Sequence, residues 1–349
     1  MTLLLLGLNH RVAAVALREQ LAIPLRELPT ILHALRTGGA VDEAVVLSTC
    51  NRIECYVASP DPAAASRHVL DVLAHHSRLD PRAFAGQCYR LMDQEAARHL
   101  FRVASGLDSM ILGESEVTAQ VKQAYMTAQT AGAVGPLLHR LFQKALHGVK
   151  IIRTQTRIAD GQASIGSIVL ALAKQHVGDR LTAACVLLWG AGKAAEATAR
   201  HLTAGGIQRL WIVNRTRAKA QDLASLCSGG WLSWEQAMAH LAHVDIAVVC
   251  TQAPHYVINT GDLVGILPRR AGRPLLLVDL AVPRNVDPDL KHHGGVHLYN
   301  IDDLNAIAQT TMTERQRALQ DCAPLIEEQV RHCWRRSQSA TLPQETVPC

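Results

Sequence analysis

The first 155 residues or so combine short apolar runs with longer stretches that are apolar along one side only. Apolar runs of strand length occupy three ranges: 3–8, 44–47 and 55–58. Apolar positions recur at the three-to-four spacing of a helix in four further ranges: 28–35, 64–79, 94–104 and 137–152. This mixture predicts an α+β region in which a few strands are covered by longer helices.

Between about residues 160 and 300 the pattern changes to a regular alternation of strand and helix. Four apolar runs bounded by turn residues are expected to be strands: 185–189, 210–213, 246–250 and 275–278. Helical segments lie between the first pairs of these runs. Alternation of this kind predicts a parallel sheet with helices on its faces.

From Asp302 to Arg336 the pattern predicts one long helix. Its apolar side would consist of five residues: Leu319, Cys322, Ile326, Val330 and Cys333. Pro324 has no backbone N–H to donate, so we expect a kink or a break there. The residues after 336 lack periodicity and are expected to form a flexible tail over 337–349.

Composition narrows the class of protein. Apolar residues make up 48% and charged residues 19%, which suits a sizeable core and argues against disorder. The 35 basic against 30 acidic residues allow a basic patch without requiring a polyanionic partner. No apolar run approaches the ~18 residues that cross a bilayer, so no membrane association is expected. The nine cysteines are scattered without a C-x-x-C pair, which favours reduced thiols in the cytoplasm over disulfides or a metal site.

A dinucleotide-binding fingerprint follows the run 185–189 directly: Gly190, Ala191, Gly192, Lys193, Ala194 and Ala195. Gly190 would allow the tight turn, Gly192 would let the backbone approach a pyrophosphate, and Ala195 would let helix and strand pack closely. The alternative is an ordinary turn of an α/β sheet, although the strand before and the helix after favour the fingerprint.

The next predicted strand ends in Asn214, Arg215 and Thr216. Enzymes that use NAD usually place an acidic residue here, whereas an arginine can grip a 2′-phosphate with two hydrogen bonds. We therefore predict NADPH as the cofactor. The alternative for Arg215 is an exposed surface charge without a ligand.

A candidate nucleophile lies in a short polar loop between the runs 44–47 and 55–58. Cys50 is flanked there by Thr49, Asn51 and Arg52, and the nearby guanidinium would favour the reactive thiolate. A thiolate can capture an activated carboxyl group as a thioester, which hydride then reduces to an aldehyde. The alternative is that Cys50 is a small buried apolar residue, as free cysteines often are.

The Cys50 loop, together with several other blocks, resembles the glutamyl-tRNA reductase family. The resemblance extends over about residues 3–320 and rests on several blocks: Leu47–Glu54, Gly7–His10, Leu17–Glu19, His99–Gly113, Asp279–Arg284 and Tyr299–Leu304. It implies an α/β fold with an N-terminal α+β catalytic domain, a Rossmann-type doubly wound NADP-binding domain and a long C-terminal helix. The expected boundaries are 1–157, 158–300 and 301–336, followed by the tail 337–349.

The resemblance also implies a reaction. Cys50 would attack glutamate esterified to its tRNA, and NADPH would reduce the thioester to glutamate-1-semialdehyde, in the first step of tetrapyrrole (heme) biosynthesis. His99 would assist the thiol or polarise the acyl group, unless it is a structural helix residue. The residues expected to hold the glutamyl group are Thr49, Asn51, Arg52, Ser109, Glu114, Ser115, Glu116 and Gln120. Glutamate-1-semialdehyde aminomutase is the further partner that the resemblance suggests.

Transfer RNA requires cations on the protein surface. A series at helical spacing opposite the apolar stripe of 137–152 is one candidate: Arg140, Lys144, His147, Lys150, Arg153 and Arg157. A solvated outer face without a ligand explains these residues equally well.

Three departures from the family pattern keep another reading open. Glu116 stands where the family usually has glutamine, and its charge would repel a glutamyl carboxylate unless paired. The dimer-forming segment that follows the long helix in the family is short here, so a homodimer, a weak dimer and a monomer all stay open. Pro324 interrupts that helix. A diverged paralogue that binds glutamyl-tRNA or a pathway partner with little activity is the alternative, and a shikimate-dehydrogenase-like reductase that leaves Cys50 without a role is a third reading.

Overall fold

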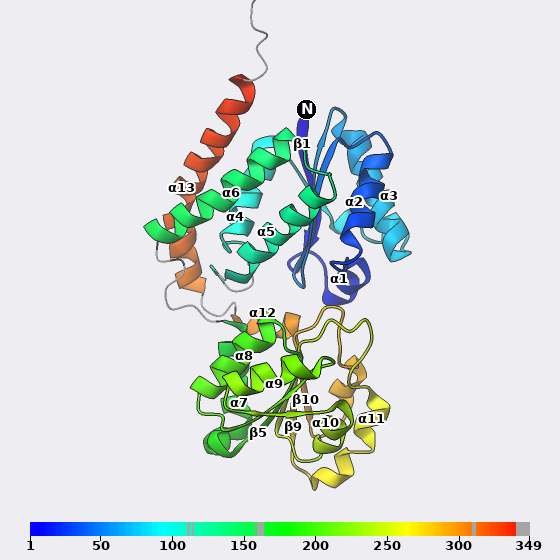
Figure 1. Cartoon of the computed structure of the whole chain (residues 1–349), viewed down its shortest axis with the longest axis vertical. Coiled ribbons are helices and arrows are strands. Elements are labelled where there is room, and N and C mark those ends of the chain that lie inside the picture. The colour runs from blue at the N-terminus through cyan, green and yellow to red at the C-terminus, as the bar shows by residue number, and fades with distance from the viewer. Residues whose placement is uncertain (110–111, 114, 157, 159–163, 309–311, 340–349) are drawn as a thin grey trace, which may run out of the picture. The chain divides into compact units, whose positions relative to one another are not determined.

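The computed structural model describes residues 1–109, 112–113, 115–156, 158, 164–308 and 312–339. It divides the chain into two compact units (Figure 1). The first comprises Met1–Gln162 together with Thr311–Cys349, and the second comprises Ala163–Thr310. The first unit is therefore built from two separate stretches of chain.

The first unit contains a four-stranded antiparallel sheet. Its strands, in the order β2-β3-β1-β4, are β2 (Glu43–Ser48), β3 (Arg52–Ser59), β1 (Thr2–Asn9) and β4 (Tyr89–Met92). The central strand β1 is buried from Leu3 to Asn9, because strands flank it and helices cover both faces. A continuous apolar run is the expected sequence for such a strand. The predicted strands 3–8, 44–47 and 55–58 are confirmed.

Helices cover both faces of this sheet (Figure 1). One face carries α1 (Val15–Leu21), α2 (Leu28–Thr37) and α3 (Pro62–Ser77). The other carries α4 (Asp93–Ala104), α5 (Ser115–Thr130) and α6 (Pro136–Gln155). The predicted helices 28–35, 64–79, 94–104 and 137–152 are confirmed as α2, α3, α4 and α6, whereas α1 and β4 had not been predicted.

The prediction of one helix over 301–336 is wrong. Two helices occupy this range: α12 (Ile301–Ala308), which belongs to the second unit, and α13 (Met312–Ser339), which packs on α4 and α6 of the first. The apolar side of α13 completes the core of the first unit with Cys322, Ile326, Val330 and Cys333.

Pro324 lies inside α13 and does not end it. An ion pair with two hydrogen bonds between Arg98 of α4 and Glu327 fastens α13 to the first unit. The predicted tail begins within α13, and its residues beyond Ser339 lie outside the described part of the chain.

The second unit contains a six-stranded parallel sheet in the order β10-β9-β8-β5-β6-β7. Its strands are β5 (Cys185–Trp189), β6 (Arg209–Val213), β7 (Gly230–Leu232), β8 (Ile246–Val249), β9 (Leu275–Asp279) and β10 (Val296–Asn300). The strand order reverses between β5 and β8, which is the doubly wound Rossmann arrangement. Ligands of such sheets bind beyond the carboxyl ends of the strands at that reversal.

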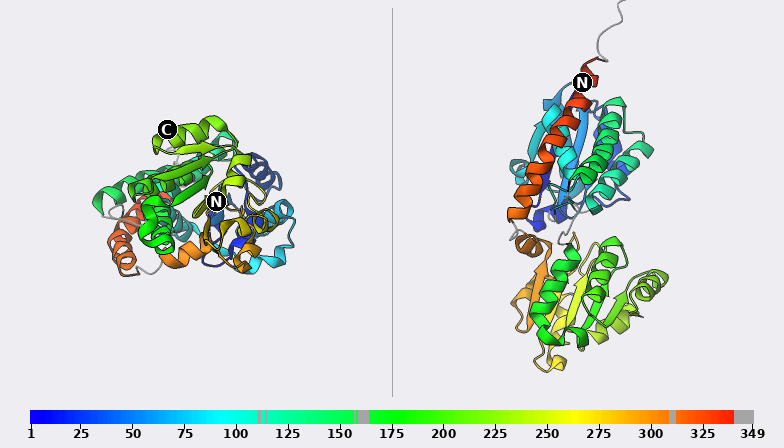
Figure 2. Two further views of the ribbon diagram at one scale, coloured as in Figure 1. Left: turned by 90° about the horizontal axis from the view of Figure 1, so that it is seen from below. Right: turned by 90° about the vertical axis from the view of Figure 1, so that its left-hand side faces the viewer.

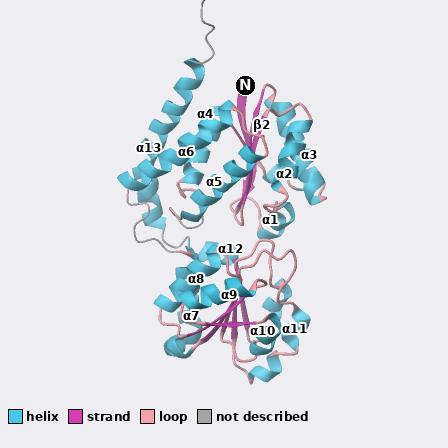
Figure 3. Cartoon of the chain, in the orientation of Figure 1, coloured by secondary structure: helices cyan, strands magenta, loops and turns pink. Residues whose placement is uncertain are grey.

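Helices lie on both sides of this sheet, as the views in Figures 2 and 3 show. The set is α7 (Ile165–Val177), α8 (Lys193–Ala204), α9 (Arg217–Leu226), α10 (Trp234–His240), α11 (Thr260–Val264) and α12. The predicted fold class, including the parallel sheet, is confirmed. Across the described residues, no helix combines the length and apolar character that a membrane span requires.

Candidate functional site

Cys50 lies at the tip of the hairpin that joins β2 to β3. Thr49 shapes this turn: its backbone N–H donates to the carbonyl of Arg52 at 2.8 Å. Its hydroxyl oxygen accepts from the backbone N–H groups of Asn51 and Arg52, both at 3.2 Å. The Thr49 hydroxyl thus satisfies two backbone N–H groups of the turn. The Cys50 side chain is half-buried.

Two neighbouring segments hold the backbone on either side of this cysteine. The buried Arg18 of α1 donates from Nε to the Cys50 carbonyl at 3.1 Å and from Nη1 to the Ala13 carbonyl at 2.8 Å. The N–H of His10, just after β1, donates to the carbonyl of Asn51 at 2.9 Å. The position of the thiol is therefore set by β1, α1 and the hairpin together.

A buried carboxylate organises the charged groups behind the hairpin. Glu54 is 0% exposed, and both of its oxygens accept hydrogen bonds. Oε1 accepts from Arg52 Nη1 at 2.7 Å and from the Tyr89 hydroxyl at 2.6 Å, and Oε2 accepts from the Tyr56 hydroxyl at 2.7 Å. His99 Nε2 lies 2.8 Å from Oε1. The predicted residue His99 is therefore anchored to Glu54.

Burial and ion pairing shift the pKa values of Glu54 and Arg52 in opposite directions. Burial alone would raise the pKa of Glu54, but the nearby His99 and Arg52 and the hydrogen bonds to the carboxylate lower it overall. Burial would likewise lower the pKa of Arg52, and the Glu54 carboxylate more than offsets this. Both side chains therefore stay ionised inside the unit as a buried, fully hydrogen-bonded pair.

The structure places Arg52 differently from the expectation that it faces a ligand. It is 1% exposed, and its Nη1 and Nη2 donate inward, to Glu54 and to the backbone carbonyl of Asp108 at 2.7 Å. The Asp108 carboxylate also lies 3.7 Å from Arg52 Nη1. Two further guanidiniums, of Arg11 and Arg102, lie 3.0 Å and 3.9 Å from the Asp108 carboxylate.

These guanidiniums create a positive environment near the hairpin. Burial, followed by the charges of Arg52, Arg11 and Arg18, lowers the pKa of His10 to about 4, although Asp108 opposes the shift. Cys55 provides a contrast, because burial among apolar side chains raises the pKa of its thiol to about 12. Burial thus disfavours a thiolate at Cys55, inside the sheet.

The remaining residues predicted for the glutamyl pocket are described in part. Ser109 is buried at the end of the segment after α4, and Ser115 is the first residue of α5. On α5 the Gln120 amide donates to Glu116 Oε1 at 3.4 Å, so this pair lies on one side of the helix. Glu114 lies outside the described residues. All the described candidates belong to the first unit: Thr49, Cys50, Asn51, Arg52, His99, Ser109, Ser115, Glu116 and Gln120.

The basic face predicted on α6 is only partly exposed. Arg153 is half-buried and its Nη2 donates to the Gly113 carbonyl at 3.0 Å, so it supports the segment before α5 instead of facing outward. Arg140 and Lys144 are half-buried near Cys333 of α13. Burial raises the pKa of the Cys333 thiol, and these two positive charges oppose that shift. His147 and Lys150 are exposed, and Arg157 lies outside the described residues.

The glycine-rich turn after β5 has the geometry of a phosphate-binding loop. Gly190 has a φ of +114°, and a Cβ there would lie 2.4 Å from the carbonyl oxygen of Cys250. The opposite holds for Gly192, where a Cβ would meet no atom within 4 Å. Gly190 is therefore required by the fold, whereas the open space at Gly192 leaves room for a ligand against the backbone.

The other fingerprint residues begin the helix that follows. Gly192 is the N-cap of α8, Lys193 begins the helix, and no side chain caps its first N–H groups. Uncapped N–H groups at a helix start favour an anion such as a pyrophosphate. Ala191, Lys193 and Ala194 border this end, and the fully buried Ala195 brings α8 close to the sheet.

The turn after β6 carries the residues predicted to select the cofactor. The Asn214 amide donates to the Thr216 carbonyl at 3.1 Å, which closes the turn. Arg215 is exposed, and next to Thr216 the Arg217 guanidinium lies 4.3 Å from the ring centroid of Trp231. An exposed arginine at this point of a Rossmann sheet is available for a 2′-phosphate.

Sequence reasoning missed several residues of the charged cluster, chiefly Glu54, Tyr89, Asp108 and Arg11. A signal for Glu54 was present, because Arg52, Glu54 and Tyr56 alternate in a strand and must face the same side. Three polar side chains on a covered side imply a mutually satisfied group. Asp108 gave no comparable signal, because it comes from a distant turn.

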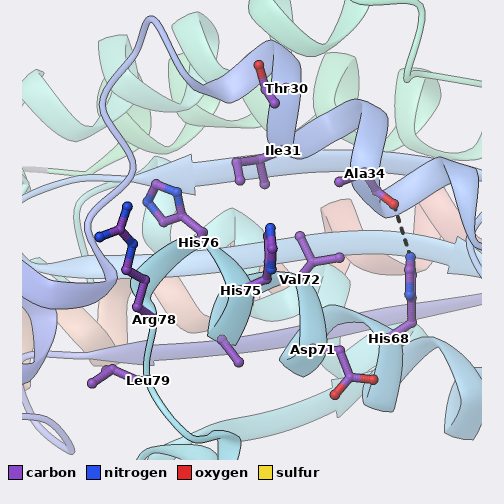
Figure 4. A pocket seen from close by; sticks show the side chains of 11 residues that line it. Thr30, Ile31, Ala34, His68, Asp71, Val72, His75, His76, Arg78 and Leu79 are labelled. Carbon is purple, nitrogen blue, oxygen red and sulfur yellow. Dashed lines mark hydrogen bonds between the residues drawn. The ribbon is translucent and has the colours of Figure 1, made fainter.

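A separate groove lies between α2 and α3 (Figure 4). Its volume is about 930 Å³, and Ile31, Val72 and Leu79 line it together with His68 and His75. Its lining includes none of the predicted site residues. The Nε2 of His68 lies 3.2 Å and 3.0 Å from the carbonyls of Ala34 and Leu35, which ties α3 to α2.

Comparisons with known proteins agree with this geometry. Residues 6–156 match the family model for the N-terminal domain of glutamyl-tRNAGlu reductase, and residues 171–307 match the model for shikimate / quinate 5-dehydrogenase. Together with the Rossmann strand order, the second match supports a nicotinamide dinucleotide as the cofactor.

Full-length relatives and one solved structure extend the comparison. The glutamyl-tRNA reductase of Syntrophotalea carbinolica is 38% identical over 98% of this chain and 77% of its own length. That of Akkermansia muciniphila is 38% identical over 95% of this chain and 96% of its own. The solved glutamyl-tRNA reductase of Methanopyrus kandleri is 32% identical, covers 97% of this chain and 81% of its own, and superposes with a TM-score of 0.53. The chain therefore belongs to the glutamyl-tRNA reductase family.

Proposed function

We propose that this protein reduces the glutamyl group of glutamyl-tRNA to glutamate-1-semialdehyde through a thioester on Cys50. The observation that carries the proposal is the placement of Cys50 at the tip of a hairpin, with Arg18 on its carbonyl and His10 on the next one. The buried guanidiniums of Arg18, on the Cys50 carbonyl, and of Arg52, two residues after Cys50, supply the positive charge that favours a thiolate. The backbone around the thiol is thus held in place, and Cys50 is half-buried and outside the apolar core.

In the first step the Cys50 sulfur attacks the ester carbonyl carbon. A C–S bond forms and the bond to the ribose oxygen breaks. That oxygen takes up the proton that the Cys50 thiol loses, so the tRNA leaves with a free hydroxyl. Reduced nicotinamide dinucleotide, when bound, supplies a hydride to the acyl carbon. The C–S bond then breaks, so the product is an aldehyde and the Cys50 sulfur is free again.

The surrounding side chains position the acyl group. Glu54 fixes the ring of His99 through Nε2, which leaves Nδ1 as the nitrogen that can serve the acyl oxygen or the thiol. Because Arg52 is committed to Glu54 and Asp108, we assign it a positioning role for the hairpin. The residues proposed to contact the glutamyl group are Thr49, Asn51, Ser109, Glu114, Ser115, Glu116 and Gln120.

Arg215, with Asn214 and Thr216, is proposed to bind the 2′-phosphate of NADPH. The exposed guanidinium at the end of β6 supports this preference over NADH. We further propose that the product passes to glutamate-1-semialdehyde aminomutase in the cytoplasm.

The test is a matched pair of cysteine variants incubated with glutamyl-tRNA, with and without NADPH. Cys50→Ser is expected to form neither thioester nor semialdehyde, because a hydroxyl is a far weaker nucleophile and yields an ester that resists hydride. Cys88→Ser is the control, since Cys88 is also half-buried but bonds only to the Phe84 carbonyl at 3.5 Å among the contacts described. Full reductase activity in Cys50→Ser would overturn the mechanism.

A further inference from the structure

Two arginines at the edge of the charged cluster are open to solvent. The Arg11 side chain is 43% exposed and the Arg102 side chain 39% exposed, and both face the carboxylate of Asp108. We call Arg11 and Arg102 the arginine pair and Asp108 its anchor. Arg52, the third guanidinium near Asp108, is buried and committed to Glu54.

Both arginines are placed by elements that also build the thiol site. Arg11 lies in the turn after β1, where its N–H donates to Asn9 Oδ1 at 3.0 Å. The preceding residue, His10, bonds to the carbonyl of Asn51 in the Cys50 hairpin. Arg102 follows His99 by three residues on α4, so the two share one side of that helix. Arg11 therefore adjoins the Cys50 hairpin through His10, and Arg102 lies with it at the Asp108 carboxylate.

The charges in this region do not cancel. Asp108 is one carboxylate among three guanidiniums, and Glu54 pairs with only one of them, Arg52. Burial lowers the pKa of His10 to about 4, and Arg52, Arg11 and Arg18 act in the same direction against Asp108. A concentration of positive charge with two exposed guanidiniums is a site for an anion.

We propose that Arg11 and Arg102 bind the phosphate of the nucleotide that carries the glutamyl group, and so dock the acceptor end of the tRNA next to Cys50. This inference rests on the proposed function. The ester oxygen belongs to the terminal ribose, whose own 5′-phosphate is the nearest phosphate to the reacting carbon. A guanidinium fork matches two phosphate oxygens, and Asp108 keeps both forks oriented while the site awaits its ligand.

The more obvious cations are partly committed elsewhere. On α6, Arg153 is turned toward the Gly113 carbonyl, and Arg140 and Lys144 lie near α13. Exposed charges such as Lys150 are left for the body of the tRNA. Contact with the terminal nucleotide requires cations close to the hairpin. Arg11 follows the residue that bonds to the hairpin, and both arginines share Asp108 with Arg52.

The first experiment compares two small substrates on the wild-type protein: 3′-O-glutamyladenosine and the same compound with a 5′-phosphate. Thioester formation on Cys50 is the readout. We expect the phosphate to raise the second-order rate about tenfold or more, the factor that one charge-assisted hydrogen bond supplies. Equal rates for the two compounds would overturn the proposal, and this comparison needs no variant.

The second experiment uses Arg11→Gln and Arg102→Gln, with Arg82→Gln as the control. Arg82 is 93% exposed and forms an ion pair with Asp80, two residues before it. Each test variant should lose about tenfold with the phosphorylated compound and little with the plain adenosine ester. For glutamyl-tRNA the slope of log affinity against log salt should fall by roughly 0.7 per lost contact, the value for single strands. Arg82→Gln should leave both quantities unchanged.

The outcomes separate the inference from the function on which it rests. Equal losses with both adenosine compounds would mean that the arginines hold the glutamyl carboxylate, and the phosphate assignment would be wrong. No loss with either compound would also refute it. A wild-type protein that forms no thioester from glutamyl-tRNA would refute the proposed function instead.

Discussion

Replacing Glu54 by glutamine tests the buried charge cluster most directly. The change keeps the shape of the side chain but removes its charge. Three donors converge on Oε1, from Arg52, Tyr89 and His99, and one hydroxyl bonds to Oε2. An amide offers one oxygen, so it can replace one side of the carboxylate only, and it cannot balance the guanidinium.

The expected loss of stability is about 3 kcal/mol in the first unit. Removing one partner of a buried ion pair costs about 3–5 kcal/mol, because the other charge stays buried and uncompensated. The lower end applies here, since Asp108 lies 3.7 Å from Arg52 and retains part of the attraction. Tyr56→Phe is the smaller comparison, because it removes one hydrogen bond to a charged acceptor, worth about 1.5–3 kcal/mol.

The effect of Glu54→Gln should depend on pH in one direction. The folded pKa of Glu54 lies below the ordinary glutamate value of about 4.5, despite burial, because of His99 and Arg52. The stabilisation from this group is therefore fully present above about pH 4.5 and is lost as the pH falls through the folded pKa. The difference between wild type and variant should shrink as the pH falls below about 4.5.

Amide hydrogen exchange can measure this in the full chain, because it reads each unit separately. The slowest amides of β1 and β3 should exchange roughly 100-fold faster in Glu54→Gln at pH 7, since each factor of ten corresponds to about 1.4 kcal/mol. The amides of β5 in the second unit serve as the internal control and should not change. A loss below about 1 kcal/mol at pH 7 would refute the view that the carboxylate balances the buried guanidinium.

Three further predictions concern the cofactor and the glutamyl pocket. Gly190→Ala should destabilise the second unit in thermal melts, because its Cβ would lie 2.4 Å from the Cys250 oxygen, whereas Gly192→Ala should fold normally and weaken nucleotide binding in titrations. Equal melting of the two variants would contradict this. Arg215→Asp should weaken NADPH binding more than NADH binding, and equal weakening would remove the argument for a 2′-phosphate. Glu116→Gln should leave the KM for glutamyl-tRNA unchanged or lower it, and a large increase would show that the carboxylate contributes to binding.

The strands and helices that could be predicted from the sequence are those with long, uniform patterns. β1 and β5 are continuous apolar runs because both of their faces are covered. β4 could not be predicted, since it has four residues that alternate in burial at the edge of the sheet. α1 was missed for a related reason: it is seven residues long, and Arg18 occupies one of its buried positions.

The site was predictable where the chemistry is local and was missed where it depends on the fold. Cys50 and the Gly190 turn stand out because their neighbours in the sequence are also their neighbours in space. The partners of Glu54 come from β3, β4 and α4, and no local pattern relates Tyr89 to His99. The inward direction of Arg52 follows from these distant partners, so the sequence alone suggested a ligand for it.

The return of α13 to the first unit has a consequence for synthesis on the ribosome. Every residue of the second unit leaves the exit tunnel before Cys322 and Ile326, which complete the core of the first. The nascent chain must therefore hold the apolar surfaces of α4 and α6 uncovered while an entire Rossmann sheet is translated. Chaperone dependence should accordingly be greatest in the interval before α13 emerges, and it should end when that helix docks.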